Sequence, residues 1–62
     1  MIYEKIRQIC DKEKISLPKL EQTLGFGNGT ITKWKTSMPS VDKLKKVADH
    51  FDVTVDELLK ED

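Results

Sequence analysis

A chain of 62 residues has room for a single domain, and its length alone excludes the large enzyme folds. Hydrophobic residues make up 37% and charged residues 35%, which suits several short amphipathic helices around one small core. Eleven basic residues oppose eleven acidic ones, so the formal net charge of zero does not by itself indicate a nucleic-acid partner.

The first segment carries apolar residues at helical spacing and predicts a helix to about Lys12, whose inner face comprises Ile2, Ile6, Ile9 and Cys10. A second helix is predicted after Ser16, a suitable N-cap, with Pro18 tolerated in its first turn and Gly25 ending it. Its apolar stripe comprises Leu17, Leu20 and Leu24.

A third helix is predicted to start near Asn28, with Asn28 as its own cap and with Ile31 and Trp34 pointing inward. Ser40 is the predicted N-cap of a fourth helix, whose stripe comprises Leu44, Val47, Ala48 and Phe51. Thr54 and Glu57 form a capping-box pattern that predicts a fifth short helix. Five helices and no strand predict a compact all-α domain over residues 1–62.

The charges are distributed unevenly along the chain. Residues 14–46 contain seven lysines and two acidic residues, whereas residues 47–62 contain one lysine and six acidic residues. This distribution predicts a basic middle that faces phosphate and an acidic tail that points away from it. The alternative is two solvated helix faces of opposite sign.

Cysteine and histidine are each present once, as Cys10 and His50, which excludes an internal disulfide and a cysteine-rich zinc site. We expect Cys10 to be a buried, inert core residue, and we expect no metal, cofactor or small-molecule substrate. No nucleophile–base arrangement indicates an enzyme. No apolar run reaches the roughly 20 residues of a membrane span and no signal-peptide pattern opens the chain, so we expect a cytoplasmic protein without a membrane partner.

The most informative stretch is SLPKLEQTLGFGNGTITKW, residues 16–34, where two short helices joined by a glycine-started turn have the form of a helix-turn-helix unit. From Ile6 to Leu59 the chain resembles the Cro and phage-repressor type of helix-turn-helix domain. The residues that carry the resemblance are Leu20, Leu24, Gly25, Ile31 and Trp34, followed by PSVDKLKKVADHFDVTVDELL. The resemblance implies a lambda-repressor-like five-helix fold that binds DNA.

The resemblance also implies that Asn28, Gly29, Thr30 and Lys33 face the major groove from a recognition helix that begins at Asn28. Asn28 can contact adenine, Thr30 phosphate or a thymine methyl, and Lys33 guanine or phosphate. Gly29 offers no side chain but lets the backbone approach closely. Each residue also has a simpler interpretation, with Asn28 as a helix cap and Lys33 as a solvated lysine.

The predicted DNA-binding set is completed by Lys35, Ser40 and Lys43. Lys43 is the favoured phosphate contact, because it lies in the first turn after Ser40 beside the backbone N–H groups of a helix N-terminus. Glu21 departs from the family pattern, since relatives usually carry a small residue there, and we expect its side chain to tilt outward.

These features predict a transcriptional regulator, a repressor of phage or mobile-element type, which by resemblance binds a palindromic operator as a homodimer. The alternative is a protein-interaction module on the same fold, an antitoxin or anti-regulator, supported by the zero net charge, the acidic tail and Gly29. Two further alternatives stay open: a complete small regulator, or the DNA-binding half of a longer one.

Overall fold

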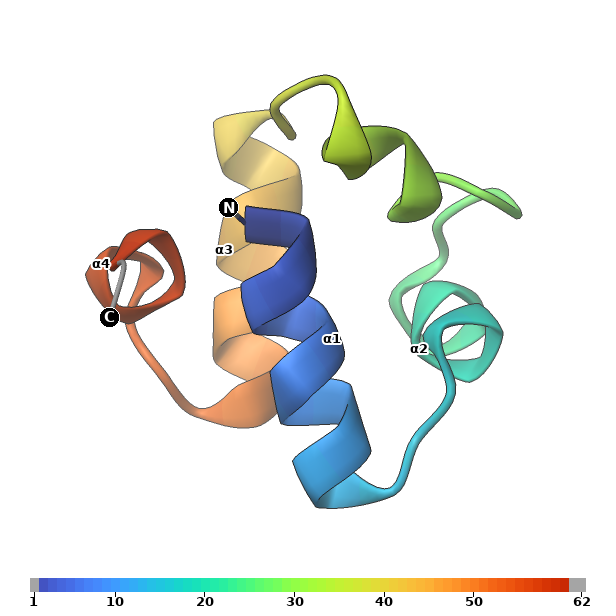
Figure 1. Ribbon diagram of the computed structural model, residues 1–62, viewed down its shortest axis with the longest axis horizontal. Coiled ribbons are helices and arrows are strands. Elements are labelled where there is room, and N and C mark those ends of the chain that lie inside the picture. Colours follow the sequence, from blue (N-terminus) through green and yellow to red (C-terminus); the bar gives the residue numbers. More distant parts are fainter. Residues whose placement is uncertain (1, 61–62) are drawn as a thin grey trace.

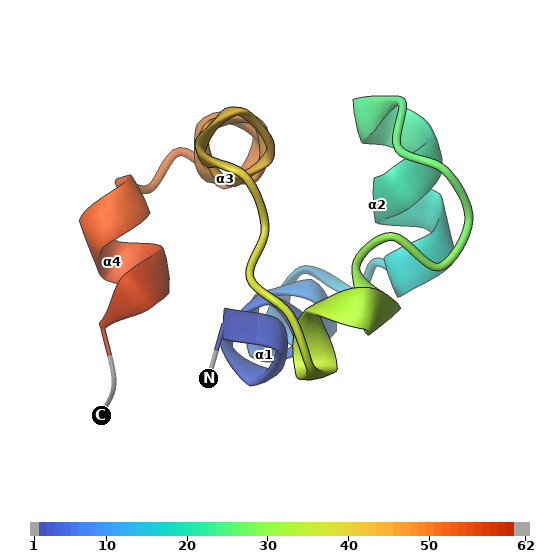
Figure 2. The ribbon, with the colours of Figure 1, turned by 90° about the horizontal axis from the view of Figure 1, so that it is seen from above.

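The computed structural model describes residues 2–60, which form four α-helices, one 3-10 turn and, within that range, no strand. The elements are α1 (Ile2–Glu13), α2 (Leu17–Leu24), η1 (Thr32–Lys35), α3 (Val41–Phe51) and α4 (Val55–Leu59). Helix α1 packs against α2, η1 and α4, and α3 packs against α4. Figures 1 and 2 show α2 and α4 on opposite sides of the pair formed by α1 and α3. The all-α prediction is confirmed.

Three helices begin at the hydroxyl caps that the sequence predicted. The side-chain oxygen of each cap accepts a hydrogen bond from the backbone N–H three residues later: Ser16 from Lys19 (3.2 Å), Ser40 from Lys43 (3.3 Å) and Thr54 from Glu57 (3.1 Å). Each bond satisfies one of the N–H groups that a helix start leaves without an intrahelical partner. The beginnings of α2, α3 and α4 therefore follow from local sequence.

Three helices also end in the same way, with one residue in the left-handed region: Lys14 after α1 (φ 58°), Gly25 after α2 (φ 77°) and Asp52 after α3 (φ 56°). The next backbone N–H then reaches back to a helix carbonyl, from Ile15 to Cys10 (2.9 Å), from Phe26 to Glu21 (2.8 Å) and from Val53 to Ala48 (3.0 Å). This is the Schellman arrangement, in which an apolar residue after the turn contacts the helix. Ile15, Phe26 and Val53 accordingly pack against the core.

The core joins all five elements. Its buried apolar side chains are Ile2, Tyr3, Ile6, Cys10, Leu20, Ile31, Trp34, Leu44, Val47, Ala48 and Leu58. Trp34 is 5% exposed, and its ring meets that of Phe26 edge to face with the centroids 6.1 Å apart. The predicted inward direction of Ile31 and Trp34 is confirmed.

The third predicted helix is wrong in its start, its length and its cap. Asn28 and Thr30 lie in a turn, and regular structure begins only at Thr32, as a 3-10 turn of four residues rather than an α-helix. The position before η1 is Ile31, which makes no side-chain capping bond. Gly29 adopts φ +81°, which interrupts a right-handed helix and which glycine tolerates at low cost. Residues 2–60 therefore form four α-helices instead of the five that were expected.

Within residues 2–60, no helix combines the length and apolar character that crossing a bilayer requires. The same residues contain no group of three or more histidine, cysteine, aspartate or glutamate side chains arranged to hold a metal ion.

Replacement of Trp34 by alanine is expected to lower the free energy of unfolding by about 3–5 kcal/mol, because it removes a large ring from the core. That loss is a large part of the stability of a domain this small. Chemical denaturation of both proteins measures the difference. A variant that melts cooperatively with an almost unchanged midpoint would contradict the prediction.

Cys10 is 1% exposed, and burial raises the pKa of its thiol, an effect to which the neighbouring Asp11 carboxylate adds. Since the thiolate is the reactive form, both the raised pKa and the burial slow modification in the folded state. A thiol reagent at pH 8 should label the native protein much more slowly than the denatured one. Equal rates in the two states would show that Cys10 is accessible.

Candidate nucleic-acid interface

Four of the seven predicted DNA-binding residues line one shallow groove: Thr30, Lys33, Ser40 and Lys43. Thr30 belongs to the turn before η1, Lys33 to η1 itself, and the other two to the start of α3. Three separate segments thus bring two lysines and two hydroxyl groups to one surface. The Thr30 hydroxyl donates to the Gly27 carbonyl at 2.7 Å, which holds the turn residue in place.

A second hollow continues this surface toward α2. It is lined by residues 25–27 and Thr30 on one side and by Ser40, Asp42, Lys43 and Lys46 on the other. Lys46 was absent from the predicted set, although it follows Lys43 by three residues and so shares its helix face. That spacing was the signal that could have identified it. The carboxylate of Asp42 lines the same hollow and partly offsets the positive charge there.

The start of α3 adds a backbone contribution to this surface. The Ser40 side chain accepts a hydrogen bond from the Lys43 N–H. The N–H groups of the first helical turn form the positive end of the helix dipole. An anion at this end is therefore favoured by the helix as well as by the ammonium groups of Lys43 and Lys46. The combination is suited to a phosphate group.

Asn28 is exposed, but it faces another hollow, beside the beginning of α2. The residues that line this hollow are Ser16, Pro18, Lys19, Gln22, Gly25, Phe26 and Asn28. Lys19 and Gln22 were not among the predicted site residues. They lie near Asn28 only because the turn after α2 folds back toward that helix. The 25–30 segment thus separates the hollow that Asn28 lines from the one that Lys43 lines.

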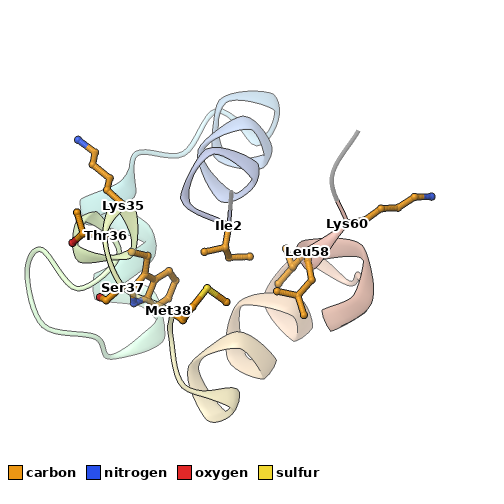
Figure 3. A pocket seen from close by; sticks show the side chains of 9 residues that line it. Ile2, Lys35, Thr36, Ser37, Met38, Leu58 and Lys60 are labelled. Carbon is orange, nitrogen blue, oxygen red and sulfur yellow. The ribbon is translucent and has the colours of Figure 1, made fainter.

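The structure also places Lys35 apart from the groove that Thr30, Lys33, Ser40 and Lys43 line. Its ammonium lies 5.0 Å from the centre of the Tyr3 ring, a cation–π arrangement with α1. It borders an apolar pocket of about 340 Å³ that also involves Ile2, Met38 and Leu58. Figure 3 shows Lys35 and Lys60 extending away from this pocket at opposite ends.

Glu21 corrects a second expectation, because its side chain does not tilt outward. It is 3% exposed and is the only buried charged side chain among residues 2–60. One carboxylate oxygen, Oε1, accepts from the Gly29 N–H at 3.2 Å, and Oε2 accepts from the Ile31 N–H at 2.8 Å. The turn folds back over α2 and offers these two N–H groups, so the carboxylate is stabilised inside. Bonds that span eight and ten residues leave no local signal in the sequence.

In a comparison with known protein families, a family model described as the Cro/C1-type HTH DNA-binding domain matches residues 5–61. Comparison with curated proteins and with solved structures gives no match. The matched range includes the turn, η1 and α3, and therefore every residue of the surface described above.

Proposed function

The chain belongs to the Cro/C1-type helix-turn-helix DNA-binding domain family, and we propose that it is a transcriptional regulator that binds double-stranded operator DNA sequence-specifically. The observation that carries this proposal is the single surface on which Thr30 and Lys33 meet Ser40 and Lys43. The finer proposal is a repressor of phage or mobile-element type that binds its operator as a homodimer. Its support is the family membership alone.

The proposed phosphate contact lies at the start of α3. Lys43 and Lys46 supply two ammonium groups, and the helix N-terminus supplies oriented N–H groups. Contacts of this kind set the position of a protein on the duplex but do not distinguish one sequence from another. They supply most of the affinity and its dependence on salt.

The proposed reading of bases falls to the segment that runs from Asn28 into η1. Asn28 has an amide suited to the N6 and N7 edge of adenine, and Lys33 an ammonium suited to guanine. Both side chains are exposed, whereas Thr30 and Gly29 are half-buried. Because η1 is one short 3-10 turn, the reading element in this proposal is a turn with a brief helix behind it, instead of a full recognition helix. A role for Lys35 on DNA stays a prediction.

A second candidate function is binding of another protein, as an antitoxin or anti-regulator. The observation that favours it is the apolar pocket near α4, where Met38 is 68% exposed and Leu59 is 45% exposed. Exposed apolar groups around a hollow are typical of protein contact sites. A stable complex with a protein that DNA does not displace would support this candidate.

Replacement of Lys43 by alanine is expected to weaken binding to all duplex sequences alike, because its proposed partner is phosphate. The slope of log K against log salt should become shallower by about one unit. Titration of a fluorescent duplex at several salt concentrations measures both quantities. Lys60→Ala is the matched control, since Lys60 follows α4 and borders the apolar pocket instead of the groove. Equal weakening by the two substitutions would contradict the proposed surface and favour the protein-binding candidate.

Replacement of Asn28 by alanine is expected to cost about 1–3 kcal/mol on the preferred operator and much less on random DNA, because its proposed partner is a base edge. The preferred operator is obtained by selecting bound sites from random duplexes. Asn28 is exposed and does not cap η1, so the substitution should change stability by no more than about 0.5 kcal/mol. An equal loss on both DNAs would remove Asn28 from the reading set.

A further inference from the structure

Glu21 joins the two ends of the segment between α2 and η1. Its backbone carbonyl accepts from the Phe26 N–H at 2.8 Å, where the segment leaves α2. Its carboxylate accepts from the N–H groups of Gly29 and Ile31, where the segment enters η1. Glu21 therefore forms hydrogen bonds with both ends of the segment that connects α2 to η1.

The carboxylate fixes the part of the turn around Gly29 and Ile31, in addition to the bonds that the Thr30 N–H and hydroxyl donate to the Gly27 carbonyl. Gly29 adopts φ +81°, which glycine tolerates at low cost. Because glycine has no side chain, many other backbone conformations are also open to it. A carboxylate that accepts two N–H groups at once requires both to point the same way, which selects one arrangement of residues 29–31. Hydrogen bonds to an ionised acceptor are also stronger than those between neutral groups.

The selected arrangement separates an inner side from an outer side. The two N–H groups face Glu21 in the interior, and Ile31 is fully buried behind them. On the outer side, Asn28 and Lys33 are exposed. The position of both proposed base-reading side chains therefore depends on the turn that the carboxylate holds.

We propose that Glu21 is a positioning residue for sequence reading: its carboxylate, bonded to the Gly29 and Ile31 N–H groups, holds the 28–33 segment in the form that distinguishes operator from random DNA. Glu21 itself is buried and contacts no DNA. The inference rests on the proposed DNA-binding function and assigns the discrimination step to a residue outside the contact surface.

Glutamine is the informative substitution because it has nearly the same shape. Its amide oxygen can still accept one N–H, but its NH₂ group is a donor and would meet the other N–H donor. Glu21→Gln should therefore fold and lose one of the two bonds. Glu21→Asp keeps the charge and shortens the side chain by one methylene, so it also should lose at least one bond without changing the electrostatic attraction to DNA.

The experiment uses the full chain and two readouts. Amide hydrogen exchange by NMR should be about tenfold or more faster at Gly29 or Ile31 in Glu21→Gln. Exchange at Phe26, whose bond goes to the backbone of Glu21, and at Leu44 in α3 should be unchanged. The affinity ratio between selected operator and random duplex should fall about tenfold, with Glu21→Asp falling in the same direction.

Glu13→Gln is the matched control, because it removes the same negative charge from an exposed position at the end of α1. It should alter both affinities equally and leave the ratio unchanged. If the melt of Glu21→Gln shows an unfolded protein, the ratio measured on Glu21→Asp decides.

Three results would overturn the inference. The first is an unchanged affinity ratio in a folded Glu21 variant whose Gly29 or Ile31 amide exchanges faster, which leaves the proposed DNA binding intact. The second is unchanged exchange at both amides, which shows that the carboxylate does not hold the turn. The third is no preference for any duplex in the unaltered protein, which overturns the proposed function as well.

Discussion

A carboxylate inside a protein is costly unless hydrogen bonds compensate the water that it loses, and in this domain the compensation for Glu21 comes from two backbone N–H groups. The dependence runs in both directions. Without the turn, Glu21 would be a buried charge without partners, and without Glu21 the N–H groups of Gly29 and Ile31 would face the interior unsatisfied. The two bonds therefore couple the stability of α2 to that of the segment that follows it. Since Ile31 is buried and Trp34 follows three residues later, the same bonds also direct η1 into the core.

The remaining structure is assembled from short helices, none of which is long enough to be stable alone in water. Their ends supply much of what specifies the fold. Hydroxyl caps start three helices, and left-handed residues end three, each followed by an apolar residue that packs on the core. Two of those left-handed positions carry Lys14 and Asp52 instead of glycine. In a domain with a small core, such defined ends help to select one arrangement of the helices.

Local signals were sufficient to predict four of the helices from sequence. Ser16, Ser40 and Thr54 marked their starts correctly because capping acts over three residues, and Gly25 marked an end for the same reason. The third element was mispredicted because its conformation is decided by Glu21, through bonds across eight and ten residues. The candidate site divided in the same way. Thr30, Lys33, Ser40 and Lys43 line one groove, whereas Asn28 and Lys35 lie apart from it, Asn28 because of how the turn folds and Lys35 because its ammonium lies over Tyr3.

The zero net charge of the chain is compatible with a polyanionic partner because the charges are separated in space. The molecule measures 26 × 24 × 18 Å. The Debye length is about 8 Å at physiological ionic strength, so charges at opposite ends act almost independently. Lys33, Lys43 and Lys46 line the hollows near η1 and the start of α3, whereas Asp56 and Glu57 begin α4. Figure 2 shows α4 on the side of the molecule away from α2 and the turn. A duplex on the basic surface would therefore meet a local positive electrostatic potential, which the net charge of the chain does not describe. At lower salt the Debye length is longer, so the acidic residues of α4 would reduce that potential more strongly.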